Sequence, residues 1–225
     1  MSDEQTTETQ ATEAPEPTVG NSMAKNSLLL GLFALVTAAL LSGTYSATAD
    51  RIAAAERANA QKALLQVIPL ERHNNDLLET TQAIDERYWK ALGLKQGGKL
   101  HIAQQDGAPV AVIYPATAPD GYSGDIKMIV GINLDGTIAG VRVLTHTETP
   151  GLGDKIDLAK SDWILGFNGK SLATAQWAVK KDGGEFDAFD GATITPRAVV
   201  NQIKRALEVY QTSQPLTAEE QEANQ

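Results

Sequence analysis

The stretch DIKMIVGINLDGTIAGVRVLTH, residues 125–146, predicts the fold of the main body of this chain. Its two halves are rich in valine and isoleucine and have alternating apolar positions, a pattern typical of β-strands. Asp135 and Gly136 stand between the halves and suit a tight hairpin turn. The segment therefore indicates two neighbouring antiparallel strands.

The same pattern continues toward the N-terminus. LHIAQQ (100–105) and PVAVIYPAT (109–117) also resemble strands. Asp106 and Gly107 stand between them and suit a second tight turn. Four strands joined in this way predict an antiparallel sheet.

Two helices accompany the predicted strands, from Asp85 to Leu92 and from Pro196 to about Tyr210. In the second helix, Thr195 is expected to be the cap and Pro196 the first helical residue. Its apolar residues recur at helical spacing, at Val199, Ile203, Ala206, Leu207 and Tyr210. Strands and helices together predict an α+β domain built around an antiparallel sheet.

Residues 26–49, NSLLLGLFALVTAALLSGTYSATA, contain no charged side chain. A helix needs about 20 residues to cross a bilayer, so this run predicts a transmembrane anchor. A cleaved secretory signal is the alternative, because Ala47-Thr48-Ala49 resembles a cleavage site. The uncharged run continues past Leu41 and an acidic segment precedes it, which favours a retained anchor. In both cases the rest of the chain is expected on the outer side of the membrane.

The charged residues on the two sides of the span favour the opposite orientation. Lys25 lies on the N-terminal side, and Arg51, Arg57 and Lys62 lie on the other side. The positive-inside rule would therefore place the large domain in the cytoplasm. The charge count alone does not settle the orientation.

The remaining segments differ in composition. Residues 1–25 are predicted to be a disordered acidic tail, because Thr, Glu, Pro and Ala predominate at their start. Residues 50–68 are rich in helix formers and predict a stalk helix, although an ordinary packed amphipathic helix fits equally well. The main domain is expected over residues 69–213, and a second acidic tail over residues 214–225.

Composition excludes several kinds of chemistry. The chain has no cysteine, which excludes disulfides, thiol catalysis and iron–sulfur ligation, so a redox role would need a bound cofactor. Its three histidines are far apart and form no zinc signature. The net charge of −9 comes mostly from the two tails, and no basic stripe favours nucleic-acid binding. No catalytic residue and no metal ligand is predicted.

The stretch THTETPGLGDKID, residues 145–157, directly follows a predicted strand. Pro150, Gly151 and Gly153 predict a tight turn, and glycines allow a backbone to approach a ligand closely. Glu148 and Thr149 are expected at the rim of this turn. An ordinary turn between a strand and a helix explains the same residues.

A second stretch, DAFDGATITPRAVV, residues 187–200, stands at the start of the last predicted helix. A turn at Asp190-Gly191 followed by a helix cap explains much of it, but leaves Asp187 and Thr193 unexplained. Free amide groups at a helix N-terminus favour an anion such as phosphate. A threonine in this place can therefore carry a phosphate ester.

The segment DAFDGAT resembles the flavinylation motif of the FMN-binding domain family, which is Asp, two free positions, Ser or Thr, Gly, Ala and Thr. HTETPGLGDKID (146–157) and WAVKKDGGEFDAFDGATITPRAVV (177–200) are similar to G subunits of the Rnf (or Rsx) ion-translocating electron-transport complex. This similarity extends from the apolar segment to about Tyr210.

The resemblance implies a role for each matching residue. Thr193 matches the threonine that holds FMN through a phosphodiester, Gly191 and Ala192 provide clearance, and Asp187 matches the leading acid of the motif. Asp190 departs from the motif, which has Ser or Thr there, and adds a negative charge near the phosphodiester. The turn expected against the flavin ring contains Glu148, Thr149, Pro150, Gly151, Leu152 and Gly153.

The resemblance also implies a function. A G subunit carries electrons within a membrane-bound ferredoxin/NAD oxidoreductase that moves ions, and it acts as a redox subunit rather than as an independent catalyst. The implied partners are the other Rnf subunits and a flavin transferase that uses FAD and magnesium. The implied location is the bacterial inner membrane, single-pass, with the domain on the periplasmic side. The alternatives are a C subunit of sodium-pumping NADH:quinone reductase and a cofactor-free, membrane-anchored assembly module.

Overall fold

The computed structural model describes residues 19–213, so the predicted C-terminal tail and most of the predicted N-terminal tail lie outside the described residues. The described residues divide into two units, one that ends at Ala55 and one that begins at Glu56. Residues 19–25, expected to be disordered, instead belong to a helix. Helix propagation adds a hydrogen bond for each residue once the helix has started, so the helix extends beyond the uncharged run.

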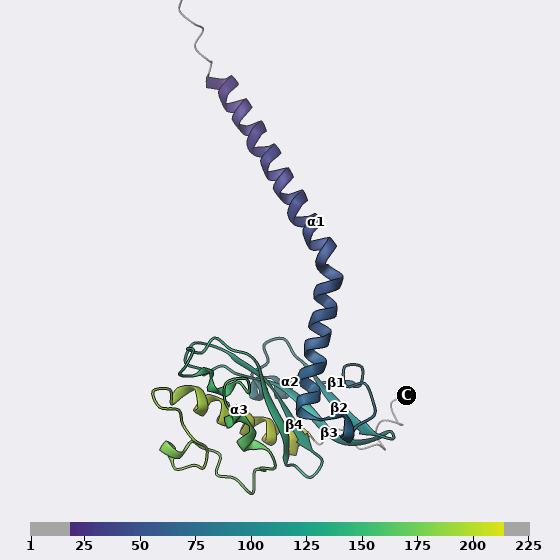
Figure 1. The fold of residues 1–225 in the computed structure, drawn as a ribbon, viewed down its shortest axis with the longest axis vertical. Helices are drawn as coiled ribbons and strands as arrows, with labels where there is room; N and C mark the ends of the chain where they lie inside the picture. The colour runs from purple at the N-terminus through teal and green to yellow at the C-terminus, as the bar shows by residue number, and fades with distance from the viewer. Residues whose placement is uncertain (1–18, 214–225) are drawn as a thin grey trace, which may run out of the picture. The chain divides into compact units, whose positions relative to one another are not determined.

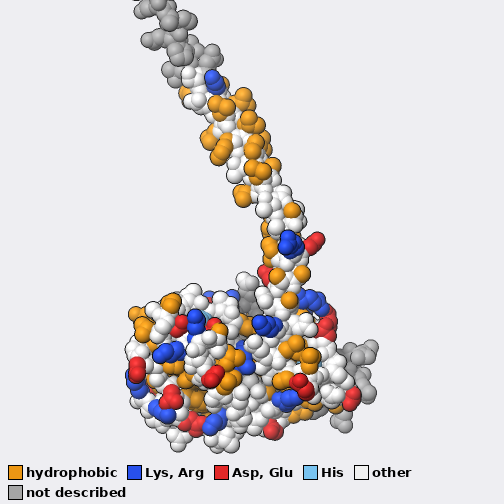
Figure 2. All heavy atoms as spheres, viewed as in Figure 1, with side chains coloured by type: hydrophobic (Ala, Val, Ile, Leu, Met, Phe, Trp, Pro, Cys, Tyr) orange, Lys and Arg blue, Asp and Glu red, His pale blue; other side chains and the backbone are white. Residues whose placement is uncertain are grey.

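This first helix, α1, runs without interruption from Val19 to Val67 (Figure 1). It contains the one candidate membrane span among residues 19–213. The side chains of Leu28, Leu30 and Leu35 are exposed, as expected for residues that face lipid, and Figure 2 shows hydrophobic side chains along this part of the helix. The predicted anchor and the predicted stalk are thus parts of one helix.

The second unit is built on a five-stranded antiparallel sheet in which neighbouring strands follow each other along the chain. This confirms the predicted α+β class. Three-residue β1 was not predicted, because it is too short to show a periodic pattern. The strands are β1 (Thr81–Ala83), β2 (Lys99–Gln105), β3 (Ala108–Ala118), β4 (Ile126–Asn133) and β5 (Ile138–Thr145).

Both predicted domain helices are present. α2 (Glu86–Leu92) begins after Asp85, whose carboxylate accepts a hydrogen bond from the Arg87 amide, and it ends at Gly93. α3 covers Ile194–Ser213 and therefore begins two residues earlier than predicted. Four short 3-10 helices complete the unit: η1 (Leu70–Arg72), η2 (Asp154–Ile156), η3 (Asp162–Phe167) and η4 (Lys180–Asp182).

Alternate residues of each strand point to opposite faces of the sheet, and each face has its own hydrophobic cluster. On one face, Val112 and Val130 belong to the cluster that contains Val199 and Ile203 of α3. On the other face, Ile113 and Ile129 belong to the cluster that contains residues 64, 67 and 68 at the end of α1. The sheet therefore lies between α3 and the last turns of α1.

Two glycines let the end of α1 approach the sheet closely. Gly131 of β4 pairs with Gly140 of β5, and a Cβ added at Gly131 would lie 2.3 Å from Cγ1 of Val67. Arg142 donates a hydrogen bond to the carbonyl of Gln66 over 3.0 Å. The residues of α1 from Ala63 onward therefore pack on the sheet, whereas residues 50–62 are exposed.

The two predicted turns differ in detail. Asp106 and Gly107 both have positive φ, 52° and 82°, as in a two-residue type I′ turn. Between β4 and β5 the loop covers residues 134–137, and Gly136 has a φ of 80°. The second connection is a hairpin, as predicted, but with a longer loop.

Candidate functional site

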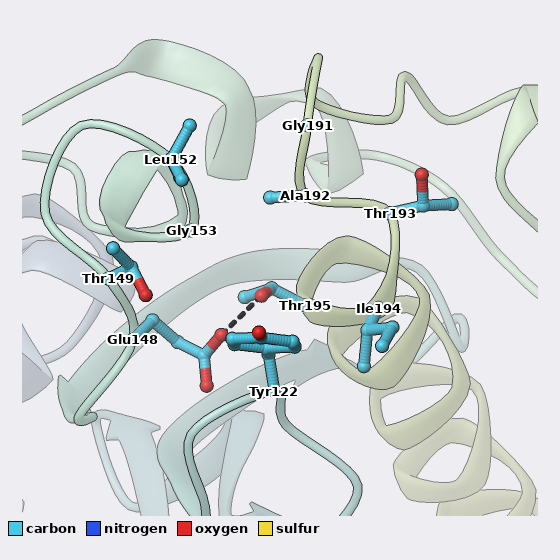
Figure 3. Close-up of a pocket in the computed structure, with 10 residues that line it drawn as sticks. All are labelled: Tyr122, Glu148, Thr149, Leu152, Gly153, Gly191, Ala192, Thr193, Ile194 and Thr195. Carbon is cyan, nitrogen blue, oxygen red and sulfur yellow. Dashed lines mark hydrogen bonds between the residues drawn. The ribbon is translucent and has the colours of Figure 1, made fainter.

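A pocket of about 320 Å³ brings together the two stretches that the sequence singled out (Figure 3). One wall comes from the loop after β5, and the other comes from the segment that leads into α3. A third segment, the connection between β3 and β4, contributes Tyr122. The lining residues are Tyr122, Glu148, Thr149, Leu152, Gly153, Gly191, Ala192, Thr193, Ile194 and Thr195.

The start of α3 differs from the prediction. Thr193 directly precedes the helix, and its carbonyl accepts a hydrogen bond from the Arg197 amide over 3.4 Å. Thr195 lies inside the helix and is fully buried, so its predicted role as the cap is wrong. Its hydroxyl instead donates a hydrogen bond to Glu148, which is 47 residues away in the sequence. Because the hydroxyl contacts Glu148, it does not cap the amide groups at the start of α3.

Glu148 is buried, with 4% of its surface exposed, so its predicted place at the rim is wrong. Besides the Thr195 hydroxyl, its carboxylate accepts a hydrogen bond from the Ser123 amide over 2.9 Å. Two donors from different segments compensate for the desolvation of the carboxylate. Glu148 thereby connects the loop after β5 to α3 and to the β3–β4 connection.

Little space is left for a side chain where the loop crosses this network. A Cβ added at Gly153 would lie 2.9 Å from Oγ1 of Thr195 and 3.0 Å from Oε2 of Glu148. The amides of Leu152 and Gly153 both donate to the carbonyl of Thr149, over 3.1 and 3.0 Å, and close the predicted tight turn. Gly151, with φ of 80°, occupies the left-handed region in that turn.

Exposed apolar side chains surround the pocket. Leu152 is 44% exposed, Ile194 is 45% exposed and Tyr122 is 68% exposed. Tyr122 and Ile194 were not predicted. The flanking Gly121 and Gly124, in a short strand connection, were the one available signal for Tyr122. The arrangement provides apolar surface for a flat aromatic ligand.

One ammonium group lies directly beside the Thr193 hydroxyl. Nζ of Lys181 donates a hydrogen bond to Oγ1 of Thr193 over 3.0 Å. Arg197 pairs with Asp182 through two hydrogen bonds of 2.6 and 2.9 Å, which lower the pKa of Asp182 below its usual value and raise the pKa of Arg197. Both side chains therefore stay charged at neutral pH.

Asp187 does not line the pocket. Its carboxylate pairs with Lys180 at 2.6 Å, and its carbonyl accepts a hydrogen bond from the indole of Trp163 over 2.9 Å. Within residues 19–213 no cluster of side chains could hold a metal ion. The pocket thus offers a hydroxyl with one ammonium group beside it, and apolar walls.

Several known proteins with similar sequences are described as G subunits of an ion-translocating oxidoreductase complex. The G subunit of an ion-translocating oxidoreductase complex from Vibrio atlanticus is 47% identical, covering 88% of this chain and 96% of the relative. The corresponding proteins of Shewanella loihica and Vibrio cholerae are each 48% identical, covering 86% and 82% of this chain and 92% and 88% of the relatives. This chain belongs to the family of ion-translocating oxidoreductase G subunits. The predicted family is confirmed.

Two protein-family models match different parts of this chain. Residues 16–67 match the RnfG N-terminal region, and residues 121–208 match the FMN-binding domain family. Every residue that lines the pocket falls within the second match. The chain is also similar to the crystal structure of Shewanella oneidensis NqrC, at 26% identity and a TM-score of 0.43, covering 63% of this chain and 70% of that one.

Replacing Thr195 by valine tests the contact with Glu148. The substitution keeps the shape of the side chain but removes one donor to a buried carboxylate, so we expect a loss of about 1.5–3 kcal/mol in unfolding free energy. Chemical denaturation of the full chain in detergent would measure it. Thr212→Val is the matched control, because the Thr212 hydroxyl contacts only carbonyls of its own helix. Equal losses in both variants would contradict a special role for the Glu148 contact.

Proposed function

We propose that this protein holds FMN through a phosphodiester on Thr193 and carries electrons between the other subunits of its complex. The observation that supports this most is the meeting of the two stretches in one pocket, with the Thr193 hydroxyl at its edge. Bound FMN supplies the redox chemistry, and the described residues of this cysteine-free chain serve to hold and orient it. The protein is thus a redox component of the complex and not an independent catalyst.

A separate flavin transferase attaches the flavin, because an unactivated threonine hydroxyl is a poor nucleophile. In this reaction a bond forms between Oγ1 of Thr193 and the FMN phosphorus of FAD. The bond from that phosphorus to the AMP moiety breaks, AMP leaves and the hydroxyl proton passes to a base on the transferase. Magnesium bound to FAD would offset its negative charge.

The residues around the pocket are suited to hold the flavin ring. Leu152, Ile194 and Tyr122 offer apolar surface, and Gly153, Gly191 and Ala192 keep side-chain bulk low. Glu148 places a carboxylate beneath this surface, where it would disfavour extra negative charge on a reduced ligand. Asp187 would not contact the flavin ring directly, because it lies outside the pocket, where its carboxylate pairs with Lys180.

Intact mass of the purified chain, produced together with a flavin transferase, tests the proposal. We expect an addition equal to FMN less one water, and fluorescence of the chain in a denaturing gel. Fragment mapping should place the added mass on the peptide that contains Thr193. A chain of unmodified mass would favour the cofactor-free assembly module, although the match to the FMN-binding domain family supports a flavoprotein. The relatives described as G subunits support this family over the predicted C-subunit alternative.

We further propose that residues 26–49 anchor the protein in the inner membrane and that the domain over residues 69–213 faces the periplasm. The long apolar helix supports the anchor, and a periplasmic domain suits a covalent cofactor because lost FMN would not be recaptured there. The predicted partners are the Rnf subunits that exchange electrons between ferredoxin and a nicotinamide.

Protease added to intact spheroplasts is expected to digest the part of the chain after Asp50. The reason is that only segments outside the cytoplasmic membrane are accessible in this preparation. Immunoblots against the domain and against a tag at the N-terminus would measure the digestion. Protection of the domain together with loss of the N-terminal tag would reverse the proposed topology and support the count of Arg51, Arg57 and Lys62.

A further inference from the structure

Lys181 is a cation whose role the sequence did not predict. It lies in η4, and its Nζ donates a hydrogen bond to Oγ1 of Thr193 over 3.0 Å. Among residues 19–213 no salt bridge includes Lys181, whereas the residues on both sides of it, Lys180 and Asp182, are each paired. The neutral hydroxyl that Lys181 contacts does not neutralise the positive charge of its ammonium group. The site is therefore complementary to an anion bound at Thr193.

The neighbouring ion pairs hold the segment that carries Lys181. Asp182 accepts two hydrogen bonds from Arg197, in the first turn of α3, and Lys180 pairs with Asp187. The low pKa of Asp182, which the Arg197 hydrogen bonds cause, keeps the first pair charged. η4 is thus connected to the helix that begins directly after Thr193. Holding the backbone in place lowers the entropic cost of positioning the Lys181 side chain.

We propose that Lys181 orients Thr193 for flavin attachment and then pairs with the phosphodiester that joins FMN to it. This inference rests on the proposed covalent attachment. A phosphodiester carries one negative charge, and a lysine ammonium binds phosphate as a point charge. During attachment the same ammonium would help to stabilise the negative charge of the phosphoryl group that is transferred to Thr193. Lys181 is a positioning residue, since it neither attacks nor leaves.

The initial rate of FMN incorporation into the full-length chain tests this role. Purified flavin transferase, FAD and magnesium are added to unmodified protein, and intact mass follows the modified fraction. Lys181→Met is expected to lower the rate at least about tenfold, the order expected for losing a hydrogen bond to a charged group. Lys181→Arg, which keeps the charge, should recover most of the rate. Lys204→Met should stay within about twofold of the wild type, because Lys204 does not line the pocket and its exposed pair with Glu208 contributes little.

Each result bears on a different part of the proposal. Equal rates in the wild type and in Lys181→Met would overturn the inference but leave attachment at Thr193 intact. No incorporation into the wild type would instead overturn the proposed function. A lower melting temperature in Lys181→Met or no recovery in Lys181→Arg would replace a charge-based role with a structural one, and an equal loss in Lys204→Met would show that the effect is not specific to Lys181. Incorporation lowered in Lys181→Met alone, at unchanged melting temperature, supports the inference.

Discussion

A Thr193→Ala variant is expected to carry no covalent flavin, even when it is produced together with the flavin transferase. The substitution removes the oxygen that would form the phosphodiester, and the nearest threonine in sequence cannot replace it. That residue, Thr195, is fully buried and donates to Glu148. In-gel fluorescence and intact mass would measure the loss. We expect it to be complete rather than partial.

The fold is expected to survive this substitution. Thr193 is only partly buried, and its hydroxyl contacts a flexible lysine side chain rather than the core. Melting temperature would therefore remain close to that of the wild type. Thr193→Ser is the matched control, since it keeps a hydroxyl at the same place and should retain flavin. Flavin that stayed attached to the Thr193→Ala chain, or that mapped to Thr195, would show that another residue is the tether.

The largest expected loss of stability follows Gly93→Ala. Gly93 ends α2 with φ of 68°, in the left-handed region that residues with a side chain adopt at a cost. A Cβ added there would also lie 2.0 Å from the carbonyl oxygen of Thr117 in β3, so backbone must move. Together the strain and the overlap are expected to lower the unfolding free energy by about 3 kcal/mol or more. Chemical denaturation in detergent would measure it.

Gly107→Ala separates the two causes. Gly107 has a similar φ of 82°, but a Cβ added there meets no atom within 4 Å. Only the backbone strain remains, and we expect a loss of roughly 1–2 kcal/mol. If both variants lost the same unfolding free energy, the overlap with β3 would not contribute to the loss in Gly93→Ala. Gly93→Ala should in addition loosen the contact with α3, because Gln202 donates to the carbonyl of Ala91 at the end of α2.

Much of the fold could be predicted because its signals are local. Alternating apolar residues depend only on the two faces of a strand, so β2 to β5 were recognised, whereas β1 has too few residues to alternate. The tight turn at Asp106-Gly107 requires positive φ at both residues, and the Asp-Gly pair is among those that favour this conformation. The proposed anchor was predicted from an uncharged run long enough to cross a bilayer.

The start of α3 shows where local reasoning fails. Thr195 followed by proline is a good cap by propensity, yet its hydroxyl turns to Glu148 because folding buries both residues side by side. Propensity describes a residue beside its sequence neighbours, whereas a buried carboxylate accepts donors from any segment that reaches it. The exposure of Glu148 was mispredicted for the same reason.

Local sequence patterns were enough to predict the antiparallel sheet, the apolar helix and the family, together with Thr193 as the proposed tether. Which residues surround this threonine is instead decided by tertiary packing. Lys181 reaches it from η4, and Tyr122 reaches the same pocket from the connection between β3 and β4. These contacts follow from how α3 packs on the sheet, because that packing sets the place of the helix N-terminus relative to loops distant in sequence. Such distances are properties of the folded chain and leave no periodic trace in its sequence.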